Sequence, residues 1–130
     1  MTPVLVDTSV WRRFFAGKSS VESRQSLEAL LDEDGAVLVH TAVVGELVLG
    51  GLSAREESLF GRLPFAPNIT DEEVLTFIKR RKLARRGIGW VDAQLLASAL
   101  VATSTLWTAD RKLTEVATAL GIAFPGRWPP

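Results

Sequence analysis

The sequence predicts an α/β fold with a short, largely parallel sheet, and two observations support this prediction. Short runs of β-branched and other apolar residues alternate with segments whose apolar residues recur at helical spacing. The chain has 130 residues, 47% of them apolar and 23% charged, which fits a single domain over residues 1–130. A chain of this length can bury a core without disulfides or a structural metal.

Composition excludes several classes of protein before any motif is considered. The chain has no cysteine, so thiol catalysis, zinc-finger sites and a disulfide framework are excluded, and a reducing compartment is favoured. Fifteen Lys and Arg balance fifteen Asp and Glu, so affinity for nucleic acid must come from local clusters of charge. The apolar runs are too short to span a membrane, and the first residues lack a signal-peptide pattern. We therefore expect a cytoplasmic protein that does not enter membranes.

The first part of the chain is expected to form a strand, two helices and a second strand. Three apolar residues predict a strand over Val4–Val6, and the polar cluster from Asp7 stops this strand and starts a short helix to about Phe15. Leucines at helical spacing predict a helix over Val21–Asp32. The apolar run Ala36–Val39, which follows a glycine, predicts the second strand.

The middle of the chain is expected to be mainly helical. An apolar helix over Ala42–Leu49 follows Thr41, which can cap it, and stops at a glycine pair. Ser53 and Thr70 are each followed three residues later by Glu, the spacing of a capping box, so two further helices begin there. The second of these is expected to reach about Arg86. Two prolines between them favour a turn or a very short strand near Leu63–Pro67.

The last part begins after the break at Gly87-Ile88-Gly89. A helix from about Val91 to Ala102 consists mostly of Leu, Val and Ala, and a helix that is apolar all round is usually buried. The remaining expected elements are a strand over Thr105–Thr108, a helix over Arg111–Leu120, a last strand over Ile122–Phe124 and an irregular tail over Pro125–Pro130.

Four acidic residues lie where a carboxylate is costly or suggestive. Asp7 and Asp110 follow the ends of predicted strands, where open parallel sheets bind ligands, although each also fits the N-cap of a helix. Glu46 belongs to an otherwise apolar helix, so its carboxylate needs an arginine partner, hydrogen bonds or a metal. Asp92 opens the apolar helix near Val91, and the helix dipole alone could explain it.

Taken together, these four acids predict a metal site. Carboxylates that share one crevice repel each other and stay ionised at neutral pH only if a cation neutralises them. Oxygen ligands without His or Cys suit Mg²⁺ or Mn²⁺ rather than zinc. Such an ion can activate a water and orient a phosphodiester, so the pattern indicates a phosphodiesterase.

Four motifs carry a resemblance to a known family. In chain order they are Val6-Asp7-Thr8-Ser9-Val10-Trp11, Gly45-Glu46-Leu47, the segment from Gly87 through Trp90-Val91-Asp92 to Ala99, and Trp107-Thr108-Ala109-Asp110. In this order they resemble the PIN-domain ribonucleases, with the nearest likeness to the VapC toxins of bacterial toxin–antitoxin pairs. The likeness covers essentially the whole chain.

The resemblance implies a three-layer α/β/α sandwich and an endoribonuclease that depends on Mg²⁺ or Mn²⁺ and an activated water. It also implies a homodimer and a VapB-type antitoxin partner. Residue by residue, Asp7, Glu46, Asp92 and Asp110 match the acidic quartet that holds metal and carries catalysis. Ser9 and Thr108 match hydroxyl positions that support the quartet. Which acids bind metal directly and which act through water stays open.

A basic cluster precedes the third motif. Six of the fifteen basic residues fall between Lys79 and Arg86, and Lys79, Lys82, Arg85 and Arg86 are the candidates for binding RNA phosphates. The alternative is a solvated helix face whose cations complement the helix C-terminus.

The only histidine and the tryptophans add less. With His40 alone, cleavage by a pair of histidines is excluded, and the end of a strand favours a structural imidazole. Trp11 and Trp107 lie in apolar patterns and are expected in the core, whereas Trp90 and Trp128 are undecided. An apolar stretch over Ser53–Phe65 could form an antitoxin groove, a dimer face or ordinary packing.

Three other functions compete with the ribonuclease interpretation. Haloacid-dehalogenase phosphatases need a second Asp where Ser9 stands, and receiver domains need a Lys at a late strand where Ile122–Phe124 has none. A PIN-like module that binds RNA or protein without cleavage remains the main alternative, although four repelling carboxylates would serve no purpose in it.

Overall fold

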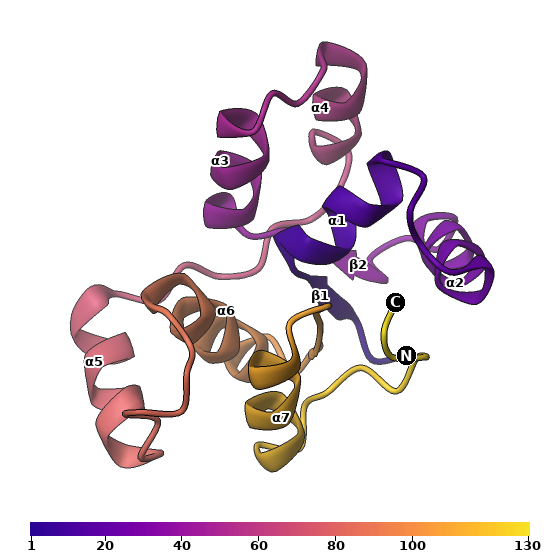
Figure 1. Cartoon of the computed structure of the whole chain (residues 1–130). Coiled ribbons are helices and arrows are strands. Elements are labelled where there is room, and N and C mark those ends of the chain that lie inside the picture. The colour runs from indigo at the N-terminus through magenta and orange to yellow at the C-terminus, as the bar shows by residue number, and fades with distance from the viewer.

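The computed structural model describes all 130 residues, in three strands and seven helices (Figure 1). In chain order they are β1 (Val4–Val6), α1 (Thr8–Phe15), α2 (Val21–Leu31), β2 (Val37–Leu38), α3 (Thr41–Leu49), α4 (Ala54–Phe60), α5 (Asp71–Arg80), α6 (Trp90–Val101), β3 (Thr105–Trp107) and α7 (Arg111–Ala119).

The sheet has the order β2-β1-β3, and every pairing in it is parallel. Val4 pairs with Val37 on one side and with Thr105 on the other, so the first strand of the chain is the central one. All three residues of β1 are buried, as expected for a strand covered on both faces. Because the strands are parallel, their carboxyl ends meet at one edge.

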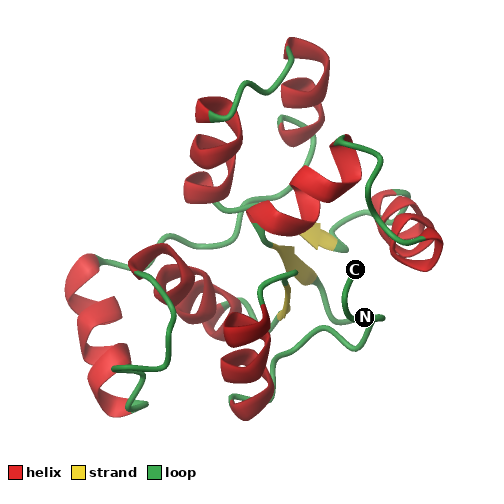
Figure 2. Ribbon diagram, viewed as in Figure 1, coloured by secondary structure: helices red, strands yellow, loops and turns green.

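The helices form the two outer layers. Figure 2 shows the strands in the middle of the molecule, with α1–α4 to one side and α5–α7 to the other. α6 packs on β1 and β3, α5 packs on the outside of α6, and α1 packs on α3. The predicted three-layer α/β/α sandwich is therefore confirmed.

Two aromatic clusters help to fill the core. Trp11 is fully buried and stacks on Phe15, with its ring edge against Phe60. Trp107 is also buried and stacks on Phe124, with the ring centroids 4.4 Å apart. The expectation that both tryptophans belong to the core is confirmed.

The helix that starts after Thr70 is shorter than predicted. α5 ends at Arg80 instead of reaching Arg86, because the chain turns to bury Leu83. The N–H of Leu83 donates to the carbonyl of Ile78 at 3.0 Å, and Lys82 between them takes a left-handed φ of 54°. Burial of one leucine thus ends a run of good helix formers.

Two predicted strands are also shorter in the structure. β2 has two residues, and beyond it Val39 makes a single parallel bridge to Phe65 in the proline-flanked segment. The last expected strand, Ile122–Phe124, contributes one parallel bridge, between Ala123 and Leu106. These bridges extend both edges of the sheet, and the tail that follows lacks regular structure, as predicted.

The cap of α3 is His40 rather than Thr41. The Nδ1 atom of His40 accepts a hydrogen bond from the N–H of Ala42 at 3.0 Å. Burial lowers the pKa of His40, which keeps the ring neutral and Nδ1 able to accept. The expectation of a structural imidazole is confirmed.

The other end of α3 is less buried than its sequence implies. Val43 and Leu47 face the core, but Val48 is half exposed and Leu49 is 89% exposed. α6, in contrast, is mostly buried, as predicted. Every helix of the structure is too short or too polar to cross a lipid bilayer.

Candidate active site

The four acidic residues come from separate parts of the chain and lie on four different helices or their caps. Asp7 stands between β1 and α1, and Asp110 between β3 and α7, at the carboxyl edge of the sheet. Glu46 lies in α3, and Asp92 lies in the first turn of α6. Figure 1 shows these elements around the end of β1.

Two hydroxyl groups hold Asp7. Ser9 Oγ donates to Asp7 Oδ2 at 2.7 Å and Thr108 Oγ1 donates to the same oxygen at 2.8 Å. Asp7 is only 7% exposed, and its side chain makes no capping bond to α1, so the N-cap alternative does not explain it. The bond from Thr108 ties the end of β3 to the end of β1, and Thr108 Oγ1 also accepts from the N–H of Asp110 at 3.0 Å.

Glu46 is held by a hydroxyl and not by an arginine. Thr8 Oγ1 donates to Glu46 Oε1 at 2.8 Å. The one ion pair in the structure joins Arg127 to Glu22, so none of the four acids has a cationic partner. The arginine ion pair considered for Glu46 is therefore absent.

Asp92 and Asp110 do perform the local roles that sequence reasoning left open for them. Asp92 Oδ2 accepts from the N–H of Gly89 at 2.9 Å, and Asp110 Oδ1 accepts from the N–H of Leu113 at 2.9 Å. Each bond uses only one oxygen of its carboxylate, so a local role leaves the second oxygen for another ligand.

The same arrangement holds for all four acids. Asp7 Oδ2, Glu46 Oε1, Asp92 Oδ2 and Asp110 Oδ1 are held by protein donors. The other oxygen of each carboxylate accepts no hydrogen bond from the protein, and none of these four oxygens is a fully buried, unpaired atom. Each acid is thus fixed through one oxygen and free at the other, an arrangement that orients a ligand before it binds.

The four charges also act on one another. Burial raises the pKa of Asp92, and the nearby negative charges of Asp7, Asp110 and Glu46 raise it further. No three acidic side chains lie close enough to enclose an ion. The charges of Asp7, Asp110 and Glu46 are nevertheless near enough to act on Asp92. Carboxylates that have no Lys or Arg partner suit Mg²⁺ or Mn²⁺. Mg²⁺ keeps several of its waters and binds few carboxylates directly.

The comparison with known families decides what this fold is. The family model described as PIN domain matches residues 4–119. The chain belongs to the PIN domain family. The resemblance drawn from the four sequence motifs is therefore confirmed.

The comparisons give this PIN domain a ribonuclease as a relative, and solved structures that have the same fold. It is 38% identical over 127 residues to ribonuclease VapC32 of Mycobacterium tuberculosis, across 93% of this chain and 95% of that protein. FitAcB from Neisseria gonorrhoeae has a TM-score of 0.63 at 21% identity, covering 88% of this chain and 93% of that one. A toxin–antitoxin complex from Klebsiella pneumoniae has a TM-score of 0.59 at 20% identity, covering 82% and 86%. These two structures share the fold.

The sequence reasoning missed two residues that support the PIN-domain site. Thr8, the donor to Glu46, stands beside Asp7, but nothing local could show that its partner lies 38 residues away. Trp128 Nε1 donates to the carbonyl of Thr108 at 3.2 Å, and Arg111 lies over the ring at 5.8 Å. The irregular tail thus contacts the backbone of a site residue.

The basic candidates are exposed and have no acidic partner. Lys79 lies in the last turn of α5, while Lys82, Arg85 and Arg86 lie in the loop between α5 and α6. A Cβ atom at Gly87 would collide with the side chain of Lys112 at the start of α7, so this loop packs closely beside the helix that follows Asp110.

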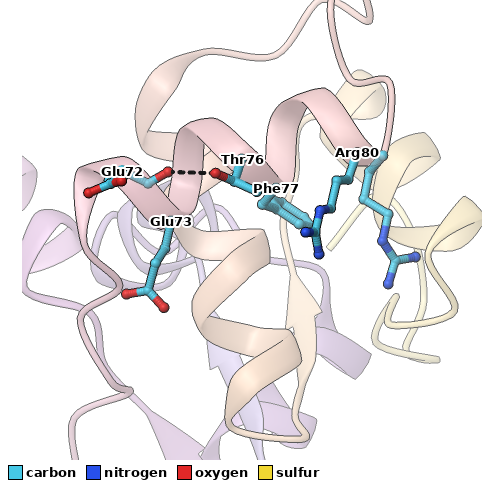
Figure 3. Close-up of a pocket in the computed structure, with 6 residues that line it drawn as sticks. Glu72, Glu73, Thr76, Phe77 and Arg80 are labelled. Atoms are coloured by element: carbon cyan, nitrogen blue, oxygen red, sulfur yellow. Dashed lines mark hydrogen bonds between the residues drawn. The ribbon is translucent and has the colours of Figure 1, made fainter.

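A surface hollow on α5 is separate from the acids of this PIN domain. It has a volume of about 430 Å³ and is lined by Glu72, Glu73, Thr76, Phe77, Arg80 and Arg81. Figure 3 shows these side chains along the face of α5, with Thr76 bonded to the backbone of Glu72. With a single apolar lining residue and acids and bases at opposite ends, the hollow offers no catalytic group that the function requires.

Proposed function

We propose that this PIN domain, a single domain over residues 1–130, is a metal-dependent endoribonuclease. We also propose that it acts in the cytoplasm as the toxin of a type II toxin–antitoxin pair. The observation that carries the proposal is the arrangement of four carboxylates, each fixed through one oxygen and none paired with a cation. Similarity to a ribonuclease over nearly the whole chain supports RNA as the substrate.

The residues that would hold Mg²⁺ or Mn²⁺, directly or through bound water, are Asp7, Glu46, Asp92 and Asp110. The ion supplies charge neutralisation at the phosphate and a more acidic water. The chain supplies the rest. Hydroxyl donors and backbone amides hold the four carboxylates in place before RNA arrives, so little reorganisation is needed during the reaction.

Each hydroxyl group has a definite task in this proposal. Ser9 and Thr108 fix the orientation of Asp7, because both of their hydroxyl groups donate to its Oδ2 atom. Thr8 does the same for Glu46. Without a cation the negative charges of the four acids repel one another, a cost that binding of a divalent ion would relieve.

The central test is removal of one charge and of the metal. In Asp7→Asn the shape and both hydroxyl contacts can be kept while the negative charge is lost, so RNA cleavage should disappear with the fold intact. Cleavage by the unmodified protein should stop in EDTA and return with Mg²⁺ or Mn²⁺. Asp34→Asn, at an exposed acid in the turn after α2, is the matched control and should cleave normally.

Two results would contradict the proposal. Asp7→Asn protein that cuts RNA at the normal rate would remove the carboxylates from the mechanism. A protein that binds RNA but never cuts it with either ion would favour the alternative function, a non-cleaving PIN-like module for RNA or protein.

We propose that the basic residues Lys79, Lys82, Arg85 and Arg86 bind the RNA backbone. All four are exposed and unpaired, and the loop that carries Lys82, Arg85 and Arg86 leads into the helix of Asp92. Phosphate contacts release counterions, so binding should weaken steeply with salt. Replacement of Arg85 and Arg86 by Gln should raise KM more than it lowers kcat, and an unchanged KM would support a merely solvated surface.

We also propose a VapB-type antitoxin and a second copy of the chain as partners. Solved structures with this fold include toxin–antitoxin complexes, and α3 presents Val48 and Leu49 to solvent. Co-expression with an antitoxin encoded beside the toxin gene should give a stable complex in which cleavage is suppressed. Light scattering of the toxin alone should give a dimer; a monomer at micromolar concentration would argue against homodimerisation.

A further inference from the structure

A second cavity lies where α5 ends and α6 begins. It has a volume of about 220 Å³, and six of its eight lining residues are apolar, among them Ile78, Leu83 and Trp90. The other two are Arg85 and Gly89. Trp90 is 41% exposed, so it is accessible to a ligand.

This cavity is joined to the candidate active site by one hydrogen bond. Gly89 lines the cavity, and its N–H donates to Asp92 Oδ2 at 2.9 Å. A group that enters the cavity therefore lies one backbone amide away from Asp92.

The loop that forms one wall carries cations at strained positions. Lys82 and Arg85 have φ values of 54° and 64°, in the left-handed region that favours Gly or Asn. Gly87 in the same loop has a φ of 79°, where glycine meets no such cost. Long cationic side chains at two positions where their backbone is disfavoured indicate that the side chains themselves have a task.

We propose that this cavity, called the α5–α6 pocket, binds an unpaired nucleobase of the RNA strand, with Trp90 as the stacking surface and Arg85 on the adjoining phosphate. The inference rests on the proposed ribonuclease function. A nucleobase offers a flat aromatic face next to an anion, which matches an apolar wall bordered by unpaired cations. An apolar segment of a second copy would match the wall but would not use the unpaired Arg85 at its border.

The binding experiment uses Asp7→Asn protein, so that RNA is not cut. The probe is a fluorescein-labelled oligoadenylate of about twelve nucleotides, compared with a strand of equal length in which every base is removed. Trp90→Ala should weaken binding of the oligoadenylate about ten-fold and hardly change binding of the abasic strand. Trp90→Phe, which keeps an aromatic face, should recover most of the affinity.

Arg85→Gly separates RNA binding from folding. Glycine suits a φ of 64°, so this variant should be as stable as the parent or more so, while its affinity for RNA falls about three- to ten-fold and its salt dependence decreases by about one ion. The matched control is Thr103→Gly. Thr103 has a similar φ of 52° but lies before β3, at the opposite end of the sheet, so the control should gain stability without a change in RNA affinity.

Three outcomes would overturn the proposal. Trp90→Ala and Arg85→Gly could both bind the oligoadenylate like the parent. Trp90→Ala could weaken binding of the abasic strand as much as it weakens binding of the oligoadenylate. Trp90→Ala could convert a dimer to a monomer in light scattering, which would assign this face to a second copy. All three outcomes are read from binding or mass measurements. Failure of the ribonuclease proposal is read from cleavage assays instead: Asp7→Asn protein would cut RNA, or the parent protein would cut none.

Discussion

Thr108→Val offers the sharpest measure of how the hydroxyl groups hold the acids. Valine has nearly the shape of threonine, and Thr108 is 3% exposed, so the change removes one buried oxygen and little else. That oxygen donates to Asp7 Oδ2 at 2.8 Å and accepts from the N–H of Asp110 at 3.0 Å.

The size of the effect follows from these two bonds. A hydrogen bond to an ionised acceptor contributes about 1.5–3 kcal/mol to the free energy of unfolding. Ser9 still donates to the same oxygen of Asp7, which places the loss toward the lower end. The freed N–H belongs to Asp110, an exposed residue, so water can replace its partner. We expect a total loss of about 2 kcal/mol, or about 6–10 °C in Tm for a chain of this length.

Urea unfolding in EDTA measures this loss, and titration calorimetry with Mn²⁺ measures the consequence for the metal. Because Asp7 would be oriented by Ser9 alone, the affinity for Mn²⁺ should fall about ten-fold. Thr108→Ser keeps the hydroxyl and is the control, with a loss below about 1 kcal/mol. If Thr108→Val were as stable as Thr108→Ser and bound Mn²⁺ equally well, the hydroxyl would have no part in holding Asp7.

Three further predictions concern charge, pH and the tail. Because burial and neighbouring acids raise the pKa of Asp92, its ionised form destabilises the metal-free fold above that pKa, and Asp92→Asn should raise the free energy of unfolding in EDTA at pH 7 by about 0.5–1 kcal/mol. The variant should gain less stability from Mn²⁺ than the parent; equal gains in calorimetry would exclude Asp92 from the site. Burial lowers the pKa of His40, so the unfolded chain takes up a proton first and stability should fall as the pH drops below about 6.5. His40→Asn can still cap the helix but has no ionisable ring. Between about pH 7.5 and about pH 5.5 the free energy of unfolding in urea should fall more in the parent than in the variant, and an equal fall would contradict the assignment. Trp128→Phe removes the N–H that donates to Thr108 and should cost about 0.5–1.5 kcal/mol in urea unfolding, whereas no loss would mean that the tail does not support the site.

Much of the fold and of the candidate site could be predicted because the signals are local. A parallel sheet places the residues after each strand at one edge, so Asp7 and Asp110 could be expected there from the positions of two apolar runs. Glu46 stood out because its helix is otherwise apolar, and the structure gives it a hydroxyl donor where sequence reasoning weighed an arginine.

What could not be predicted depends on contacts between distant residues. The end of α5 is set by burial of Leu83, which overrides the helix propensity of a basic run. The donors Thr8 and Trp128 can be identified only from the folded structure. Their partners, Glu46 and the carbonyl of Thr108, lie 38 and 20 residues away in the chain. The α5–α6 pocket is formed by the same unexpected turn, so no pattern in the sequence indicated it.

The central position of β1 has a consequence for the stage of synthesis at which the proposed cleavage site can form. The strand that leads into Asp7 is made first, yet one of its two neighbours is β3, and Asp7 is held by a hydroxyl group 101 residues later in the chain. A ribosome must therefore translate past Asp110 before all four acids can assemble. A polypeptide that stops before Thr108 contains Asp7 and Ser9 but lacks the second hydroxyl donor to Asp7 and the fourth acid, so its proposed site is incomplete.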